Sequence, residues 1–171
     1  MESRRKFLQA VGVAGTLGVA GVGTASARRP GDTITELAVA TPKFSILVAA
    51  LQRADAEAGT NLVAALDGNR QFTVFAPNDQ AFVDLLDSNP AWNGLGDIPI
   101  ETLVSVLTYH VAPGRRDAVS VTSDDELPTL NRAKIAVDGT VLNGGQADIV
   151  GADFAFASNG IIHEINGVLL P

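Results

Sequence analysis

The spacing of apolar residues changes near the middle of the chain. Up to residue 108, apolar residues recur mainly three or four positions apart, which is the spacing of one helix face. From Tyr109 onward they alternate with polar residues, which is the period of a strand with one buried face. Helices followed by strands are typical of an α+β fold, and this is the fold class that we predict.

The two periods predict the positions of the individual elements. We expect helices at residues 33–40, from Pro42 to Gly59, at 61–66, after Asn78, and at 100–108, with one early strand at 72–76 and a loop at 90–99. We expect the later strands at residues 109–112, 118–121, 127–130, 134–137, 141–142, 148–150, 153–157, 161–165 and 168–170.

Small polar residues mark the ends of several elements. Thr33 or Thr35, Thr41 and Asn78 precede apolar helical stretches and are predicted N-caps, because their side chains can accept hydrogen bonds from free backbone N–H groups. Thr73 and Asn78 bracket the early strand and its turn, so we expect both to serve the backbone there.

Two Asn-Gly pairs divide the apolar C-terminal segment. Asn159-Gly160 and Asn166-Gly167 are predicted turns, because both residue types tolerate a positive φ. The apolar residues 168–170 are then expected to return to the sheet as its last strand.

Residues 1–27 have the features of an export signal. A twin-arginine pair precedes an uncharged run rich in glycine and alanine, and the run ends in a small-residue cleavage site. The frequent glycines argue against the two alternatives, an ordinary first helix and a retained membrane anchor. An uncleaved signal would be the only membrane attachment that we expect. The residues that carry the signal are Arg4, Arg5, Phe7, Leu8, Ala25 and Ala27.

Cleavage after Ala27 would leave residues 28–171, a length typical of one domain. The signal holds three of the twelve basic and one of the nineteen acidic residues, so the mature chain carries nine against eighteen, a net charge of −9. Few lysines and many aspartates favour a halophilic surface over an ordinary acidic extracellular one. We expect no nucleic-acid partner, because phosphate binding needs a basic surface.

No catalytic or metal-binding pattern stands out. The chain has no cysteine, which excludes disulfides, thiolate nucleophiles and zinc–thiolate sites. His163-Glu164 begins like a zinc-protease motif, but the second histidine would fall at Gly167. The acidic run 124–126 lacks the ligand spacing of a calcium loop. We therefore expect no enzyme, metal or cofactor, although the numerous carboxylates leave a glycoside hydrolase as an alternative.

Three segments, in this order, resemble the fasciclin domain family. They read FTVFAPNDQAF at 72–82, LVSVLTYHVAPG at 103–114 and SNGIIHEINGVLLP at 158–171, and residues 33–51 are similar to the leading helices of that family. The resemblance implies a compact wedge with a β-sandwich-like core and flanking short α-helices. It also implies an exported or cell-surface module linked with adhesion to matrix, cells or carbohydrate. Together with the twin-arginine signal, it resembles a single-domain secreted member of the kind found in salt-loving archaea.

The resemblance also selects candidate residues. Tyr109-His110 matches a Tyr-His pair implicated in adhesion in animal members, and Asp153-Phe154 occupies a proposed contact position where many members have Asp-Ile. From its apolar surroundings alone, His110 reads more readily as a buried residue that orders a turn. The binding candidates are Tyr109, His110, Asp153 and Phe154, and the structural candidates are Thr73, Asn78, Asn159, Gly160, His163 and Asn166, the last standing where many members carry Asp.

The sequence thus predicts a noncatalytic module at the cell surface or outside the cell. Its expected partner is an envelope or extracellular-matrix protein or polysaccharide, and weak self-association would supply multivalency. The alternative is an exported carrier or sensor that holds a small apolar ligand between helices and sheet.

Overall fold

The computed structural model describes residues 31–171, so the predicted export signal lies outside the described residues. The helices are α2 (Ile34–Val39), η1 (Pro42–Phe44), α3 (Ser45–Ala58), α4 (Leu62–Asp67), α5 (Asp79–Ser88), η2 (Leu95–Asp97), α6 (Ile100–Tyr109) and α7 (Ala118–Ser123). The strands are β1 (Phe72–Pro77), β2 (Val111–Pro113), β3 (Glu126–Pro128), β4 (Lys134–Asp138), β5 (Val141–Leu142), β6 (Ala147–Ala157) and β7 (Gly160–Ile165).

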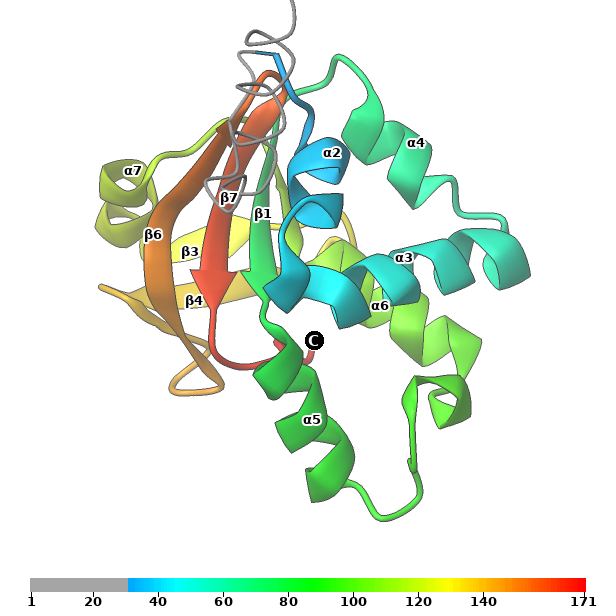
Figure 1. The fold of residues 1–171 in the computed structure, drawn as a ribbon. Coiled ribbons are helices and arrows are strands. Elements are labelled where there is room, and N and C mark those ends of the chain that lie inside the picture. The colour runs from blue at the N-terminus through cyan, green and yellow to red at the C-terminus, as the bar shows by residue number, and fades with distance from the viewer. Residues whose placement is uncertain (1–30) are drawn as a thin grey trace, which may run out of the picture.

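The strands form one mixed sheet in the order β2-β1-β7-β6-β5-β4-β3. Strands β1 and β7 are parallel, with Phe72 opposite Gly160 and Pro77 opposite Ile165, while the other neighbours are antiparallel. Helices α2 to α6 lie on one side of β1, β7 and β6, and β3 and β4 lie behind these strands (Figure 1). The fold is therefore α+β, as the periods predict.

The central strands carry a hydrophobic core on each face. On the helical side, Val74 of β1 and Ile162 of β7 pack with α3 and α6 residues such as Leu47 and Leu103. On the other side the sheet folds back over itself, and the second core consists chiefly of Phe75, Ile165, Leu127, Ile135 and Leu142. This second core is the sandwich-like part of the fold.

Several predicted helix ends are confirmed. Thr33 forms a capping box with Glu36, in which the Thr33 hydroxyl accepts from Glu36 N at 3.3 Å and Thr33 N donates to the Glu36 carboxylate at 2.8 Å. Asn78 caps α5 through a 3.0 Å bond from Ala81 N. Thr41 does not act as a cap. Its hydroxyl instead donates to Leu37 O in the preceding helix at 2.7 Å. The 3₁₀ turn η1 follows Thr41 directly and separates it from the start of α3.

Five predicted strands differ from the structure. Residues 118–121 belong to helix α7, because the Asp117 side chain accepts from Ser120 N at 2.9 Å and caps it. The strand predicted at 109–112 begins at Val111, since Tyr109 ends α6. Residues 148–150 and 153–157 belong to the single long strand β6. Residues 168–170 form no strand, because Leu169 N and Leu170 N donate to side chains of His110 and Gln146.

The two Asn-Gly pairs lie at chain reversals, but not for the predicted reason. None of their four residues has a positive φ. The glycines instead permit close backbone approach, because a Cβ on Gly160 would lie 2.0 Å from Phe72 O and one on Gly167 would lie 2.2 Å from Gln146 O.

Candidate binding surface

Tyr109 and His110 lie inside the protein. Tyr109 is 3% exposed, and its hydroxyl donates to Lys134 O at 2.8 Å and contacts the Asn143 side chain. This hydroxyl fastens the end of α6 to the folded-back part of the sheet.

His110 is 2% exposed and has partners at both ring nitrogens. Its Nδ1 lies 2.7 Å from Val106 O, and Nε2 accepts from Leu169 N at 2.9 Å, so Nδ1 carries the proton. Burial lowers the pKa of His110 to about 4, against the opposing effect of the Val106 carbonyl. The ring is therefore neutral at neutral pH and fastens the C-terminal segment to α6.

These positions correct the expectation that Tyr109 and His110 contact a partner. An external molecule cannot reach either side chain without opening the core, and both have their hydrogen bonds satisfied within the domain. The pair therefore acts on the surface only indirectly, by fixing the elements beneath it.

The other candidate pair, Asp153-Phe154, lies on a bulge of β6. Gly151 pairs with Glu164 and Ala155 with Ile162, so residues 152–154 stand opposite the single residue His163. Asp153 has a φ of 47°, which is unusual for a residue other than glycine. A bulge of this kind redirects side chains, and here it directs Asp153 and Phe154 toward different neighbours.

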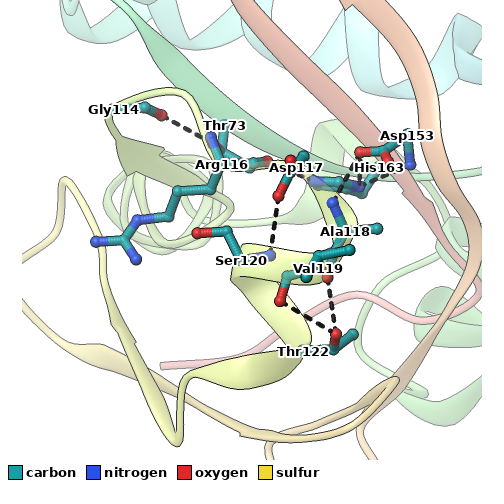
Figure 2. Close-up of polar contacts among 10 residues, drawn as sticks. All are labelled: Thr73, Gly114, Arg116, Asp117, Ala118, Val119, Ser120, Thr122, Asp153 and His163. Carbon is teal, nitrogen blue, oxygen red and sulfur yellow. Dashed lines mark hydrogen bonds and ion pairs between the residues drawn. The ribbon is translucent and has the colours of Figure 1, made fainter.

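Asp153 joins β6 to the loop before α7 (Figure 2). Its carboxylate accepts from Ala118 N at 2.8 Å, and its own N–H donates to His163 Nδ1 at 3.0 Å. His163 Nε2 in turn donates to Arg116 O at 2.9 Å. The imidazole is fully buried against Phe75, and burial lowers its pKa, although the Arg116 carbonyl and nearby carboxylates oppose this. His163 is thus a neutral connector between strand and loop.

Thr73 fixes the same loop from the other side (Figure 2). Its hydroxyl donates to Gly114 O at 2.8 Å and accepts from Arg116 N at 2.9 Å. Together, Thr73, Asp153 and His163 hold residues 114–118 against the sheet through bonds to strands β1, β6 and β7. The loop and the start of α7 are therefore held in one position relative to β6.

Phe154 packs toward the helical side. Its ring meets Phe44 edge-on at 5.4 Å between centroids, and Lys43 Nζ lies 4.3 Å from its centroid. Lys43 also pairs with Glu164, which accepts from Asn78 Nδ2 at 3.3 Å. In this chain the aromatic ring at this position is thus part of a structural cluster between η1, β6 and β7.

The remaining structural candidates join distant segments. Asn159 is 3% exposed; its oxygen accepts from Ile34 N at 2.9 Å, and its Nδ2 donates to Leu66 O at 2.6 Å and Gly68 O at 2.7 Å. The amide oxygen of Asn166 accepts from Asp148 N at 2.7 Å and so joins the end of β7 to β6. At this position, the resemblance implies an Asp carboxylate in many members of the family.

Exposed apolar residues lie beside the loop that Thr73, Asp153 and His163 hold. Phe156 of β6 is 51% exposed, and the Arg115 guanidinium lies 5.9 Å from its ring centroid. Val119 on α7 is 73% exposed, and α7 lies beside β6 (Figure 1). We call Arg115, Val119 and Phe156 the α7–β6 surface. An exposed aromatic ring beside a cation, with an exposed valine on the neighbouring helix, is typical of a protein or polymer contact site.

Sequence reasoning missed Phe156 and Val119 of this surface. Alternation marks Phe156 only as an outward residue, and the incorrect strand at 118–121 concealed the exposed position of Val119. The signal that the sequence did offer was an aromatic residue, Phe156, at an outward position in a chain with few aromatic residues.

A partly open apolar cavity lies on the helical side of the sheet. The cavity has a volume of about 40 Å³ and lies between α2, α3, α4 and the central strands, with Ala38, Leu51, Leu66 and Val74 among its lining residues.

Across residues 31–171, no three histidine or acidic side chains gather closely enough to hold a metal ion. Within the same residues, no helix is long and apolar enough to cross a membrane.

Comparison with known proteins agrees with this architecture. A family model described as Fasciclin domain matches residues 42–171. Protein sll1483 of Synechocystis sp. is 39% identical over 141 residues, covering 81% of this chain and 73% of that protein. Immunogenic protein MPB70 of Mycobacterium bovis is 32% identical over 149 residues, covering 82% and 69%.

A solved structure shows the same fold. It is a FAS1 domain pair from the insect cell adhesion molecule Fasciclin I, with a TM-score of 0.67 at 19% identity. The match covers 83% of this chain and 52% of that one, so this chain spans about half of the pair. With the family model matching most of its length, the chain belongs to the fasciclin domain family.

Proposed function

We propose that the protein is a noncatalytic adhesion module that binds a protein or polysaccharide of the cell envelope or extracellular matrix. The α7–β6 surface carries the proposal, because Phe156 and Val119 are exposed and Arg115 lies beside the Phe156 ring. Arg115 belongs to a loop that hydrogen bonds to Thr73 and His163 hold in place. Holding a contact surface in position before binding lowers the entropy lost on association. Membership of the fasciclin family and the likeness to an insect cell adhesion molecule support the same function.

The proposal places the protein outside the cell or on its surface. The twin-arginine pattern and the cleavage site support export of the folded domain, after which residues 28–171 would remain. The acidic mature chain supports a secreted member from a salt-rich environment. One small surface binds weakly, so adhesion would use several copies, through weak self-association or clustering on the cell.

Co-sedimentation with isolated cell envelopes at high salt tests the proposal. The purified protein should bind saturably, and an Arg115→Gln/Phe156→Ser variant should bind at least fivefold more weakly. Val150→Ser is the matched control, because Val150 is 54% exposed on the same strand but outside the α7–β6 surface. Circular dichroism should show the same fold for all three proteins. Absence of binding by the parent protein would refute adhesion to envelopes, and equal binding by all three would place the contact elsewhere.

The apolar cavity supports a second candidate function, a carrier or sensor of a small apolar ligand. Its volume of about 40 Å³ exceeds the roughly 10–15 Å³ that one water needs, and its lining is almost entirely apolar. Native mass spectrometry of protein purified without denaturation should show a retained ligand, and Ala38→Leu should displace it. A protein that carries no added mass would argue against this function.

A further inference from the structure

A second surface lies at the opposite end of the domain from α7. An open groove of about 470 Å³ follows the C-terminal end of α5 and the loop toward η2. In Figure 1, α5 and this loop form the lower end of the molecule, far from α7. The groove therefore differs from both the α7–β6 surface and the apolar cavity.

Trp92 is the largest apolar side chain of the groove, which Val83, Leu86 and Pro90 also line. It is the only tryptophan of the chain and is half-buried. It also borders a small apolar cavity with Phe82 and Leu103, so the core supports the ring on that side. Trp92 N donates to Asn89 O at 3.0 Å, which fixes the turn that carries the ring. The groove thus has a large aromatic side chain held in place from behind.

Polar side chains beside Trp92 keep hydrogen-bonding capacity. Within residues 31–171 the Asp87 carboxylate has no hydrogen bond or ion pair, and Asn89 uses its oxygen for Ala91 N at 3.1 Å but leaves Nδ2 without a protein partner. Asn93 donates from N and Nδ2 to Asp97, which leaves its amide oxygen as an acceptor. The groove therefore offers both acceptors and a donor around one aromatic ring.

We propose that this groove binds a neutral polysaccharide, with one pyranose ring against Trp92 and its hydroxyls bonded to Asp87, Asn89 and Asn93. A sugar ring has an apolar C–H face and a rim of hydroxyls that both donate and accept, which matches a fixed indole with mixed amide and carboxylate groups. Among residues 31–171, no basic side chain lines the groove, so a neutral chain fits better than an anionic one. The inference goes beyond the proposed adhesive function, because it adds a second site and names the class of ligand that binds there.

The intrinsic fluorescence of Trp92 tests the inference directly, because no other tryptophan contributes. Purified protein is titrated with cellohexaose, mannohexaose and xylohexaose, and with a hyaluronate hexasaccharide as the anionic comparison. At least one neutral probe should change the emission saturably at millimolar concentration or below, and hyaluronate should not. No change with any neutral probe, or an equal change with hyaluronate, would overturn the proposal.

Substitutions that keep Trp92 locate the contact. Asp87→Ala should weaken binding of the responding probe about tenfold, since a hydrogen bond to a charged group is lost. Asp84→Ala is the matched control on the same helix, because Asp84 bonds to Gln80 at 2.8 Å and does not line the groove. Equal affinities for both variants would exclude the groove as the site.

The envelope assay separates this inference from the proposed function. If the protein sediments with envelopes but no neutral sugar perturbs Trp92, adhesion stands and the groove proposal fails. If a sugar titrates Trp92 and the Asp87→Ala variant loses it while envelope binding is absent, the groove proposal stands and envelope adhesion fails.

Discussion

Replacing Asn159 should destabilise the domain more than its small side chain would indicate. The residue is almost fully buried and makes three hydrogen bonds, to Ile34 N, Leu66 O and Gly68 O. They connect the β6–β7 turn to the start of α2 and the end of α4. A net value of about 1 kcal/mol for each bond gives a loss of about 3 kcal/mol for Asn159→Ala.

Urea denaturation followed by circular dichroism measures this loss. With a slope of about 2 kcal/mol per molar urea, the midpoint should fall by about 1.5 M. Asn159→Asp should be at least as unstable, because it places a carboxylate oxygen against the two carbonyls that now accept from Nδ2. Asn166→Ala is the control, since Asn166 is exposed and its side chain has one bond, so about 1 kcal/mol or less is expected.

A loss below about 1 kcal/mol for Asn159→Ala would refute the reasoning. It would mean that water or a shifted chain satisfies Ile34 N and both carbonyls when the amide is removed. An Asn159→Asp variant as stable as the parent would contradict the assigned orientation of the amide.

Three further results are expected. Gly160→Ala should lower the free energy of unfolding by about 3 kcal/mol or more in a urea titration, because the new Cβ would lie 2.0 Å from Phe72 O. The control Gly144→Ala should lower it by only about 1 kcal/mol, because Gly144 has a φ of 65° but open space around it. The contribution of His110 to stability should be nearly complete at pH 7.5 and fall from the ordinary histidine pKa of 6.5 toward pH 4, because the unfolded chain binds a proton that the buried ring does not. Urea titrations at pH 7.5 and 5.5 cover the first unit of this window, in which His110 should account for a loss of about 1.4 kcal/mol that His110→Gln does not show. The melting temperature should rise between 0.2 M and 3 M NaCl, since salt screens the repulsion within an acidic chain, and a flat or falling curve would contradict the halophilic interpretation.

Local sequence predicted those parts of the fold that depend on neighbouring residues. The caps at Thr33 and Asn78 were predictable because each bond joins residues three positions apart. Helix α6 was predictable to within one residue because its apolar side chains have strong helical spacing. The same holds for strands β1 and β7, whose apolar runs are bounded by turn residues.

The candidate site was harder to predict, because it depends on contacts between distant residues. Residues 118–121 alternate like a strand, yet they form a helix whose first N–H donates to Asp153, 35 positions later. The left-handed conformation of Asp153 belongs to a bulge that appears only when β6 pairs with β7. No period within either segment contains this information.

The sequence by itself determined the fold class, most helices and strands, and the family to which the chain belongs, because these follow from local periodicity and from motifs in a fixed order. Only the tertiary structure decided which chemically distinctive residues are accessible. Tyr109, His110 and His163 are buried with their hydrogen bonds satisfied, while Phe156, Val119 and Trp92 are left at least partly exposed. The physical reason is that burial and hydrogen bonding are properties of the packed chain, since each of the three buried side chains has at least one partner tens of residues away.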